Sequence, residues 1–193
     1  ITRRTGEGPS VTAIAENLRL IQVEAGPAEP LEKELAIPYI PVFSEELVRF
    51  AKADSQSNDS SYDVVHSHYW QGAQAGMILA KALKVSHVVM FHTLGEAKNR
   101  ARMSEEEPEK RIEMERLQAN KADVIVVASA HEKVLLQRFY GVDARKVSVI
   151  PCGVDLEHFA PLDTQDCRRQ LGLDPDKSVF LWVGRLEELK GVD

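Results

Sequence analysis

The sequence predicts an α/β fold built on a doubly wound parallel β-sheet. Short runs rich in valine and isoleucine alternate with helix-like stretches from residue 62 to residue 150. These runs, such as 123–128 (DVIVVA), lack a strict alternation of apolar and polar residues, which is typical of strands covered on both faces. Strand–helix–strand repeats joined by right-handed crossovers form a parallel sheet with helices packed on it.

The composition indicates a globular protein and argues against several classes of partner. The chain has 193 residues, of which 44% are hydrophobic and 28% charged, and its formal net charge is -6. A negative net charge argues against binding to nucleic acid, which favours a positively charged surface. No apolar run approaches the roughly 20 residues that a membrane span needs. Residues 1–10 lack the apolar core of a signal peptide, and Cys152 and Cys167 lack CxxC spacing. We therefore expect reduced thiols and a cytoplasmic protein.

The first sixty residues predict two strands, a loop and one helix. Residues 11–25 alternate weakly and indicate a hairpin that turns around Glu16-Asn17. Residues 26–41 carry four prolines and predict a long connecting loop. Ser44 is a suitable N-cap for the helix that follows, and residues 54–61 (DSQSNDSS) predict a polar loop.

From residue 62 the pattern becomes regular. Strands are expected at 63–68, 87–92, 123–128 and 146–150, with helices at 71–83, 108–121 and 130–140 between them. Residues 151–161 (PCGVDLEHFAP) interrupt this pattern and predict a connector. A short helix at 164–171 and a buried strand at 178–183 (SVFLWV) would then begin a second domain.

The chain is also expected to be a fragment of a longer protein. It starts without methionine and stops shortly after the strand expected at 178–183. We therefore predict an incomplete first domain over residues 1–160 and the start of a truncated second domain over residues 161–193.

Polar side chains follow two of the expected strands. In a parallel α/β sheet, ligands bind outside the carboxyl ends of the strands. His66 and His68 face the same side of one strand, where they could line a substrate cleft or serve as hydrogen-bonded structural residues. Zinc would need further ligands, and neither a cysteine cluster nor an HExxH motif lies nearby, so no metal is expected. Tyr69 can stack on a sugar or bind an anion, whereas Trp70 is better explained as part of the core.

Five further residues combine charge or hydrogen bonding with a favourable place in the chain. His92, at the end of the strand expected at 87–92, and Thr93 are the first polar side chains beyond the core residue Phe91, and an imidazole titrates near neutral pH. Arg111 lies in a charged helix (SEEEPEKRIEMER), where it could be solvated or could turn inward toward a phosphate. Arg185 and Lys190 follow the last strand and together suit a diphosphate.

Four motifs together identify a family resemblance that extends from about Thr2 to the last residue. HSHYWQGAQAG, FHTL, PCGVDLEHFAP and VGRLEELKGVD occur in this order. The chain resembles the retaining "group 1" glycosyltransferases of family 4, most closely the branch that acts on inositol 3-phosphate. The resemblance implies a GT-B architecture of two Rossmann-like domains, with the acceptor held by the first and the nucleotide sugar by the second. It also implies transfer with retention, as a hexosyl or N-acetylglucosaminyl transferase that needs no cofactor or bound metal.

The same resemblance implies roles for individual residues. His92 would lie beside the transferred sugar. The acceptor's phosphate would be held by Lys33, Tyr69, Thr93 and Arg111. The donor diphosphate, of a co-substrate such as UDP-GlcNAc, would be held by Arg185 and Lys190, because cations stabilise the charge that develops on the leaving group.

The resemblance leaves the acceptor and the activity of this chain open. The glycine-rich loop of the family's first strand and the donor-site glutamates have no counterpart in these residues, so the chain alone is expected to be inactive. A sucrose-phosphate-synthase-like acceptor is the nearest alternative, and a non-catalytic α/β ligand-binding domain is the alternative from another class. The expected partners are a nucleotide sugar and a small phosphorylated acceptor, and a homo-oligomer is compatible with the sequence.

Overall fold

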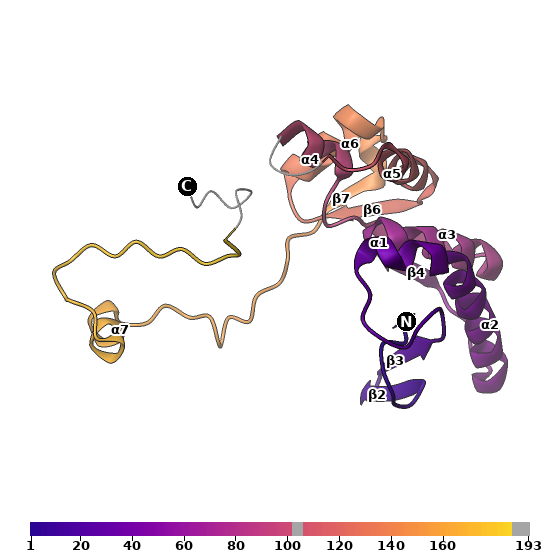
Figure 1. Cartoon of the computed structure of the whole chain (residues 1–193), viewed down its shortest axis with the longest axis horizontal. Coiled ribbons are helices and arrows are strands. Elements are labelled where there is room, and N and C mark those ends of the chain that lie inside the picture. Colours follow the sequence, from indigo (N-terminus) through magenta and orange to yellow (C-terminus); the bar gives the residue numbers. More distant parts are fainter. Residues whose placement is uncertain (102–105, 187–193) are drawn as a thin grey trace. The chain divides into compact units, whose positions relative to one another are not determined.

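A computed structural model describes residues 1–101 and 106–186 and divides the chain into two units. The first unit spans Ile1–Ile150 and the second spans Pro151–Asp193. Figure 1 shows the elements of both units coloured along the sequence.

A four-stranded parallel sheet organises the first unit (Figure 1). Its strands are β4 (Val64–His68), β5 (Ser86–Met90), β6 (Val124–Val127) and β7 (Val147–Val149). Each strand pairs with the next one in the chain, and the register places His68 opposite Met90. Because β4 and β5 end at the same edge, the residues that follow them lie side by side. The predicted α/β fold with a parallel sheet is confirmed.

Helices connect these strands. They are α3 (Tyr69–Leu83), α4 (Gly95–Ala101), α5 (Glu109–Lys121) and α6 (Ala130–Tyr140), and the 3-10 helix η2 (Ala144–Lys146) precedes β7. The predictions for α5 and α6 are confirmed, and α6 begins with a capping box between Ser129 and Glu132. Helix α4 was not predicted, and α3 starts two residues earlier than expected. No helix in the described part of the chain is long and apolar enough to cross a membrane.

The N-terminal residues form a separate small sheet. Its strands, in the order β1-β3-β2, are β1 (Thr2–Arg3), β2 (Val11–Ala15) and β3 (Leu18–Val23). Strands β2 and β3 pair antiparallel on either side of Glu16-Asn17, so the predicted hairpin is confirmed.

The segment after this sheet is more helical than predicted. The loop expected at 26–41 contains α1 (Lys33–Ala36) and the 3-10 helix η1 (Ile37–Tyr39), and α2 (Ile40–Asn58) follows directly. The prolines Pro38 and Pro41 are compatible with this because they occupy the first turns of η1 and α2, where no backbone N–H is needed.

Both predicted boundaries of α2 were wrong. Ser44 is not an N-cap: it is buried inside the helix, and its Oγ donates to the carbonyl oxygen of Ile40 at 2.7 Å. The polar stretch expected as a loop from residue 54 continues the helix, because the Asp54 carboxylate accepts two hydrogen bonds from Arg19 on β3, each 2.8 Å long. These tertiary contacts outweigh the weak helix propensity of its serines and asparagine.

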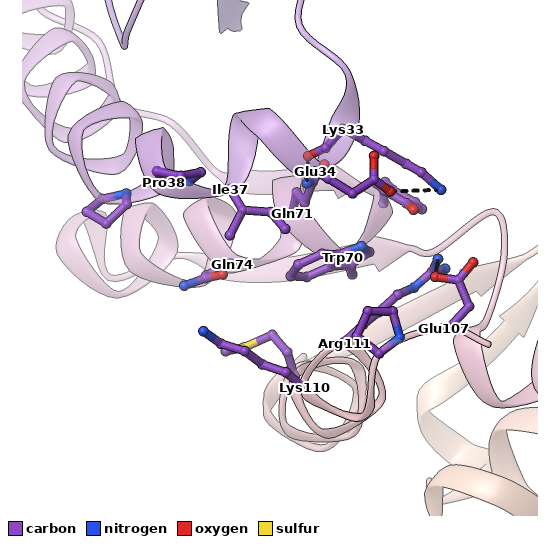
Figure 2. A pocket seen from close by; sticks show the side chains of 14 residues that line it. Lys33, Glu34, Ile37, Pro38, Trp70, Gln71, Gln74, Glu107, Lys110 and Arg111 are labelled. Carbon is purple, nitrogen blue, oxygen red and sulfur yellow. Dashed lines mark hydrogen bonds and ion pairs between the residues drawn. The ribbon is translucent and has the colours of Figure 1, made fainter. Parts of the chain in front are cut away.

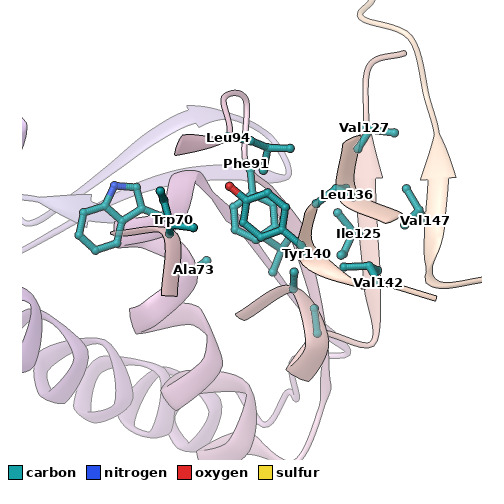
Figure 3. Close-up of a cluster of buried hydrophobic side chains, with 14 residues drawn as sticks. Trp70, Ala73, Phe91, Leu94, Ile125, Val127, Leu136, Tyr140, Val142 and Val147 are labelled. Carbon is teal, nitrogen blue, oxygen red and sulfur yellow. The ribbon is translucent and has the colours of Figure 1, made fainter. Parts of the chain in front are cut away.

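The described residues of the first unit form two hydrophobic clusters. The larger one (Figure 3) joins β5, β6 and β7 to α3, α5 and α6 through residues that include Val89, Phe91, Ile125 and Leu136. The smaller one packs α2 and α3 against β3. Trp70 is 8% exposed and belongs to the larger cluster, which confirms its assignment to the core.

The second unit contains one described helix, α7 (Thr164–Leu171), which ends at Gly172 as predicted. Asp163 caps its first turn by accepting a hydrogen bond from the backbone N–H of Asp166. The strand predicted at 178–183 does not form, and Phe180 is 99% exposed. A strand needs a neighbour to satisfy its backbone groups, and residues 151–186 include no other strand with which it could pair.

Candidate functional site

The ends of β4 and β5 carry two residues in an unusual backbone conformation. Tyr69 has a φ of 65° and His92 a φ of 63°, both in the left-handed region. Among residues 1–101 and 106–186, the two other non-glycine residues with positive φ are Asp59 and Lys84, which are helix C-caps, where this conformation is ordinary. A non-glycine residue held there outside a cap costs about 1 to 3 kcal/mol, and such residues cluster at ligand sites.

Three histidine rings gather at these strand ends. The rings of His66 and His68 lie 4.4 Å apart, and those of His68 and His92 lie 5.1 Å apart. His68 Nδ1 and His92 Nε2 share a 2.8 Å hydrogen bond. Burial lowers the pKa of His68, and positive charge on His66 or His92 would lower it further, so His68 is neutral at neutral pH. Within residues 1–101 and 106–186, no group of three or more His, Cys, Asp or Glu side chains is arranged to hold a metal ion.

Arg111 turns inward rather than into solvent, and its side chain is only 4% exposed. Its Nε donates to Glu115 Oε1 at 2.7 Å, and its Nη1 pairs with Glu107 Oε2 at 2.7 Å. Its Nη2 donates to Thr93 Oγ1 at 3.1 Å, which links helix α5 to the end of β5. Burial lowers the pKa of Arg111, but the hydrogen bond and the charge of Glu115 outweigh burial and raise it, so the guanidinium stays charged.

Glu115 holds this network in place, and sequence reasoning missed it. Its side chain is fully buried, and its Oε2 accepts hydrogen bonds from the Gly95 backbone N–H at 2.9 Å and the Tyr140 hydroxyl at 2.6 Å. Burial and the neighbouring carboxylate raise the pKa of Tyr140. The available signal was the four-residue spacing of Glu107, Arg111 and Glu115, of which Arg111 and Glu115 lie on one face of helix α5.

A cavity of about 480 Å³ opens beside this network (Figure 2). This volume lies in the range typical of small-molecule sites. The cavity is lined by Lys33, Glu34, Ile37, Pro38, Pro41, Tyr69, Trp70, Gln71, Gln74, Glu107, Pro108, Lys110, Arg111 and Met114. One part of the lining is therefore apolar and another is charged. Lys33 Nζ lies 3.4 Å from Glu34 Oε1, and the Arg111 guanidinium lies over the Tyr69 ring at 5.1 Å.

The structure brings together most of the residues for which an acceptor-side role was expected. Lys33, Tyr69 and Arg111 line the cavity, and Thr93 contacts Arg111. His92 does not line this cavity, although it is joined through His68 to the strand that precedes Tyr69.

The two residues expected on the donor side lie elsewhere in the chain. Arg185 belongs to the second unit, where it is exposed. Lys190 lies outside the described residues.

A parallel sheet with a ligand-sized cavity beside its strand ends defines an α/β domain of the kind that binds small molecules. Residues 3–158 match the model of Glycosyltransferase Family 4. The chain therefore belongs to that family.

Relatives and solved structures agree with this assignment. The D-inositol 3-phosphate glycosyltransferase of Actinosynnema mirum is 37% identical over 195 residues, which cover 100% of this chain and 46% of that protein. That of Geodermatophilus obscurus is 36% identical, with 96% and 41% covered. The structure of a sucrose-phosphate synthase from Thermosynechococcus elongatus matches with a TM-score of 0.81 at 30% identity over 98% of this chain and 46% of its own. The GT-B type of fold is thus confirmed, and the chain spans less than half the length of these relatives.

Proposed function

We propose that this chain supplies the acceptor site of a retaining glycosyltransferase. The whole enzyme would transfer a hexosyl or N-acetylglucosaminyl group from a nucleotide sugar, such as UDP-GlcNAc, to a phosphorylated polyol or sugar. Residues 1–160 would bind the acceptor, and residues 161–193 would begin the nucleotide-sugar-binding domain. Turnover would require the remainder of a protein as long as the relatives, in a reducing, cytoplasmic setting that suits the free Cys152 and Cys167.

The observation that carries this proposal is the mixed lining of the 480 Å³ cavity. Lys33 and Arg111 supply positive charge, and Tyr69 supplies a phenol that can donate to an anion. Other lining residues, which include Ile37 and Met114, are apolar and suit the C–H face of a ring. A ligand with one phosphate on a compact polyol matches both parts.

His92 would act on the sugar rather than on the phosphate. Its Nε2 is engaged by His68, so Nδ1 is the nitrogen that would hydrogen-bond the sugar as it leaves the diphosphate. With retention, the acceptor oxygen enters the face from which the diphosphate departs. In this proposal Arg185 and Lys190 stabilise the negative charge on that diphosphate.

Two acceptor classes fit the proposal. The relatives named as D-inositol 3-phosphate glycosyltransferases favour an inositol phosphate. The likeness to a sucrose-phosphate synthase favours a sugar phosphate. Calorimetric titration of the chain with D-inositol 3-phosphate and with fructose 6-phosphate would rank them, and unphosphorylated inositol would show how much the phosphate contributes.

The variant Lys33→Met tests the phosphate site without disturbing the core, because the Lys33 side chain is 50% exposed. A hydrogen bond to a charged group contributes about 1.5 to 3 kcal/mol, so the affinity for D-inositol 3-phosphate should fall roughly tenfold or more. Lys81→Met is the matched control, since Lys81 is exposed on α3 and does not line the cavity. Equal affinity of the two variants would refute the phosphate site. Binding without any transfer in a full-length protein would indicate a non-catalytic ligand-binding domain.

A further inference from the structure

Two carboxylates, those of Glu107 and Glu115, contact the Arg111 guanidinium. The Glu115 carboxylate pairs with Arg111 Nε, and the Glu107 carboxylate pairs with Arg111 Nη1, each at 2.7 Å. Thr93 accepts from the remaining nitrogen, Nη2. A phosphate that enters the cavity therefore meets a guanidinium whose nitrogens all have partners.

The two carboxylates differ in how firmly they are fixed. Glu115 lies inside helix α5, is fully buried and accepts two further hydrogen bonds, from Gly95 and Tyr140. Glu107 precedes the helix and lines the cavity. Its side chain can rotate away from Arg111 without breaking any hydrogen bond of the helix.

A local anchor would keep Glu107 in place while its side chain moved. The side chain of Asn99 accepts from the Glu107 backbone N–H at 2.7 Å and donates to its carbonyl oxygen at 3.2 Å. Lys98 pairs with Oε1 of this carboxylate while Arg111 pairs with Oε2, so Glu107 would keep one cation after it left Arg111. Burial raises the pKa of Glu107, but Lys98 and Arg111 outweigh burial and lower it, so the carboxylate is charged at neutral pH.

The charges of this group cancel. Arg111 and Lys98 carry two positive charges, and Glu107 and Glu115 carry two negative charges. A phosphate dianion added to the intact group would create an excess of negative charge in a poorly solvated place, which is unfavourable. If the Glu107 carboxylate moves away from Arg111, Nη1 of the guanidinium becomes free to donate to the phosphate.

We propose that Glu107 is an internal competitor that occupies the phosphate position on Arg111 until a phosphorylated acceptor displaces it. The inference rests on the proposed function and adds a selectivity device to it. A dianionic phosphate ester competes well against one carboxylate, whereas a monoanionic carboxylate ligand does not. Glu107 thereby restricts the cavity to acceptors that carry a phosphate.

The test compares two single variants at neighbouring positions, Glu107→Gln and Glu106→Gln. Both variants remove one negative charge, but Glu106 is exposed and does not line the cavity. Inorganic phosphate is titrated calorimetrically into the 193-residue chain at constant pH and ionic strength, and thermal melting checks that each variant is folded. Since the competing ion pair is gone, Glu107→Gln should bind phosphate roughly tenfold more tightly than the wild type, and Glu106→Gln less than about twofold.

Two results would overturn the inference in distinguishable ways. If Glu107→Gln binds phosphate no more tightly than Glu106→Gln while Lys33→Met still weakens binding, the competitor role is wrong and the phosphate site stands. If phosphate binds none of these proteins, or binds regardless of Lys33, the proposed function fails and the competitor role fails with it. Glu107→Ala repeats the comparison if the glutamine variant melts abnormally.

Discussion

Replacing Glu115 with glutamine is the most direct test of the network that holds Arg111. The glutamine has nearly the same shape, so the change removes a charge rather than volume. Glu115 accepts three hydrogen bonds, from Arg111 Nε at 2.7 Å, Gly95 N at 2.9 Å and the Tyr140 hydroxyl at 2.6 Å. A glutamine has one carbonyl oxygen, and its NH₂ group would face at least one donor.

The magnitude follows from burial. Arg111 is 4% exposed and Glu115 is 0% exposed, so the guanidinium would lose its main counter-charge without gaining water. Removing one partner of a buried ion pair costs about 3 to 5 kcal/mol. The loss should lie at the low end of this range, because Glu107 still pairs with the Arg111 guanidinium. We therefore expect Glu115→Gln to lower the free energy of unfolding by about 3 kcal/mol.

Urea unfolding followed by far-UV circular dichroism measures this loss. Glu113→Gln is the control, because Glu113 is exposed on the same helix α5 and its replacement should change stability by less than about 0.5 kcal/mol. A loss below about 1 kcal/mol for Glu115→Gln, close to that of the control, would refute the view that Glu115 stabilises the buried guanidinium.

Two further predictions concern the rest of the first unit. A Cβ at Gly76 on α3 would lie 2.7 Å from His87 Nε2, so Gly76→Ala should lose about 1 to 3 kcal/mol of unfolding free energy. Gly72→Ala on the same helix meets nothing within 4 Å and should gain about 0.5 to 1 kcal/mol, and equal effects in urea titrations would contradict this packing. The hydrogen bond from Arg19 lowers the pKa of Asp54 from 3.8 to about 2. The ion pair therefore contributes fully to the free energy of unfolding above pH 3.8, and this contribution is lost as the pH falls through about 2. Asp54→Asn should flatten that part of the stability–pH curve, and an unchanged slope would show that the ion pair does not stabilise the fold.

The alternating elements after residue 62 could be predicted because their signals are local. Val/Ile runs separated by helical stretches locate β4 to β7, and Gly141 and Gly172 mark the ends of α6 and α7. The helices between residues 33 and 58 could not be predicted in the same way. Their prolines and polar residues have low helix propensity, and contacts such as that between Arg19 and Asp54 become visible only in the folded chain.

The site was predictable in its residue types but not in its connections. Helix α5 buries Arg111, Glu115 and Gln118 among its inward-facing residues, so its polar face and its buried face coincide. An apolar stripe normally shows which side of a helix faces the core, and here that stripe is interrupted by charge. The sequence therefore left the direction of Arg111 undecided. The strand ends were clearer, because a parallel sheet places the carboxyl ends of neighbouring strands at one edge, and the register pairs His68 on β4 with Met90 on β5.

The backbone at these strand ends supports a ligand site independently of the side chains. Tyr69 and His92 both adopt left-handed conformations. Tyr69 directly follows β4, and His92 is the second residue after β5, which ends at Met90. The fold can hold them there because their neighbours Trp70 and Phe91 are buried in the larger core cluster, 8% and 4% exposed. Core packing at the adjacent positions thus offsets the backbone strain. The strained residues are the ones that carry the phenol and the imidazole, as expected where a fold fixes the direction of a side chain for a ligand.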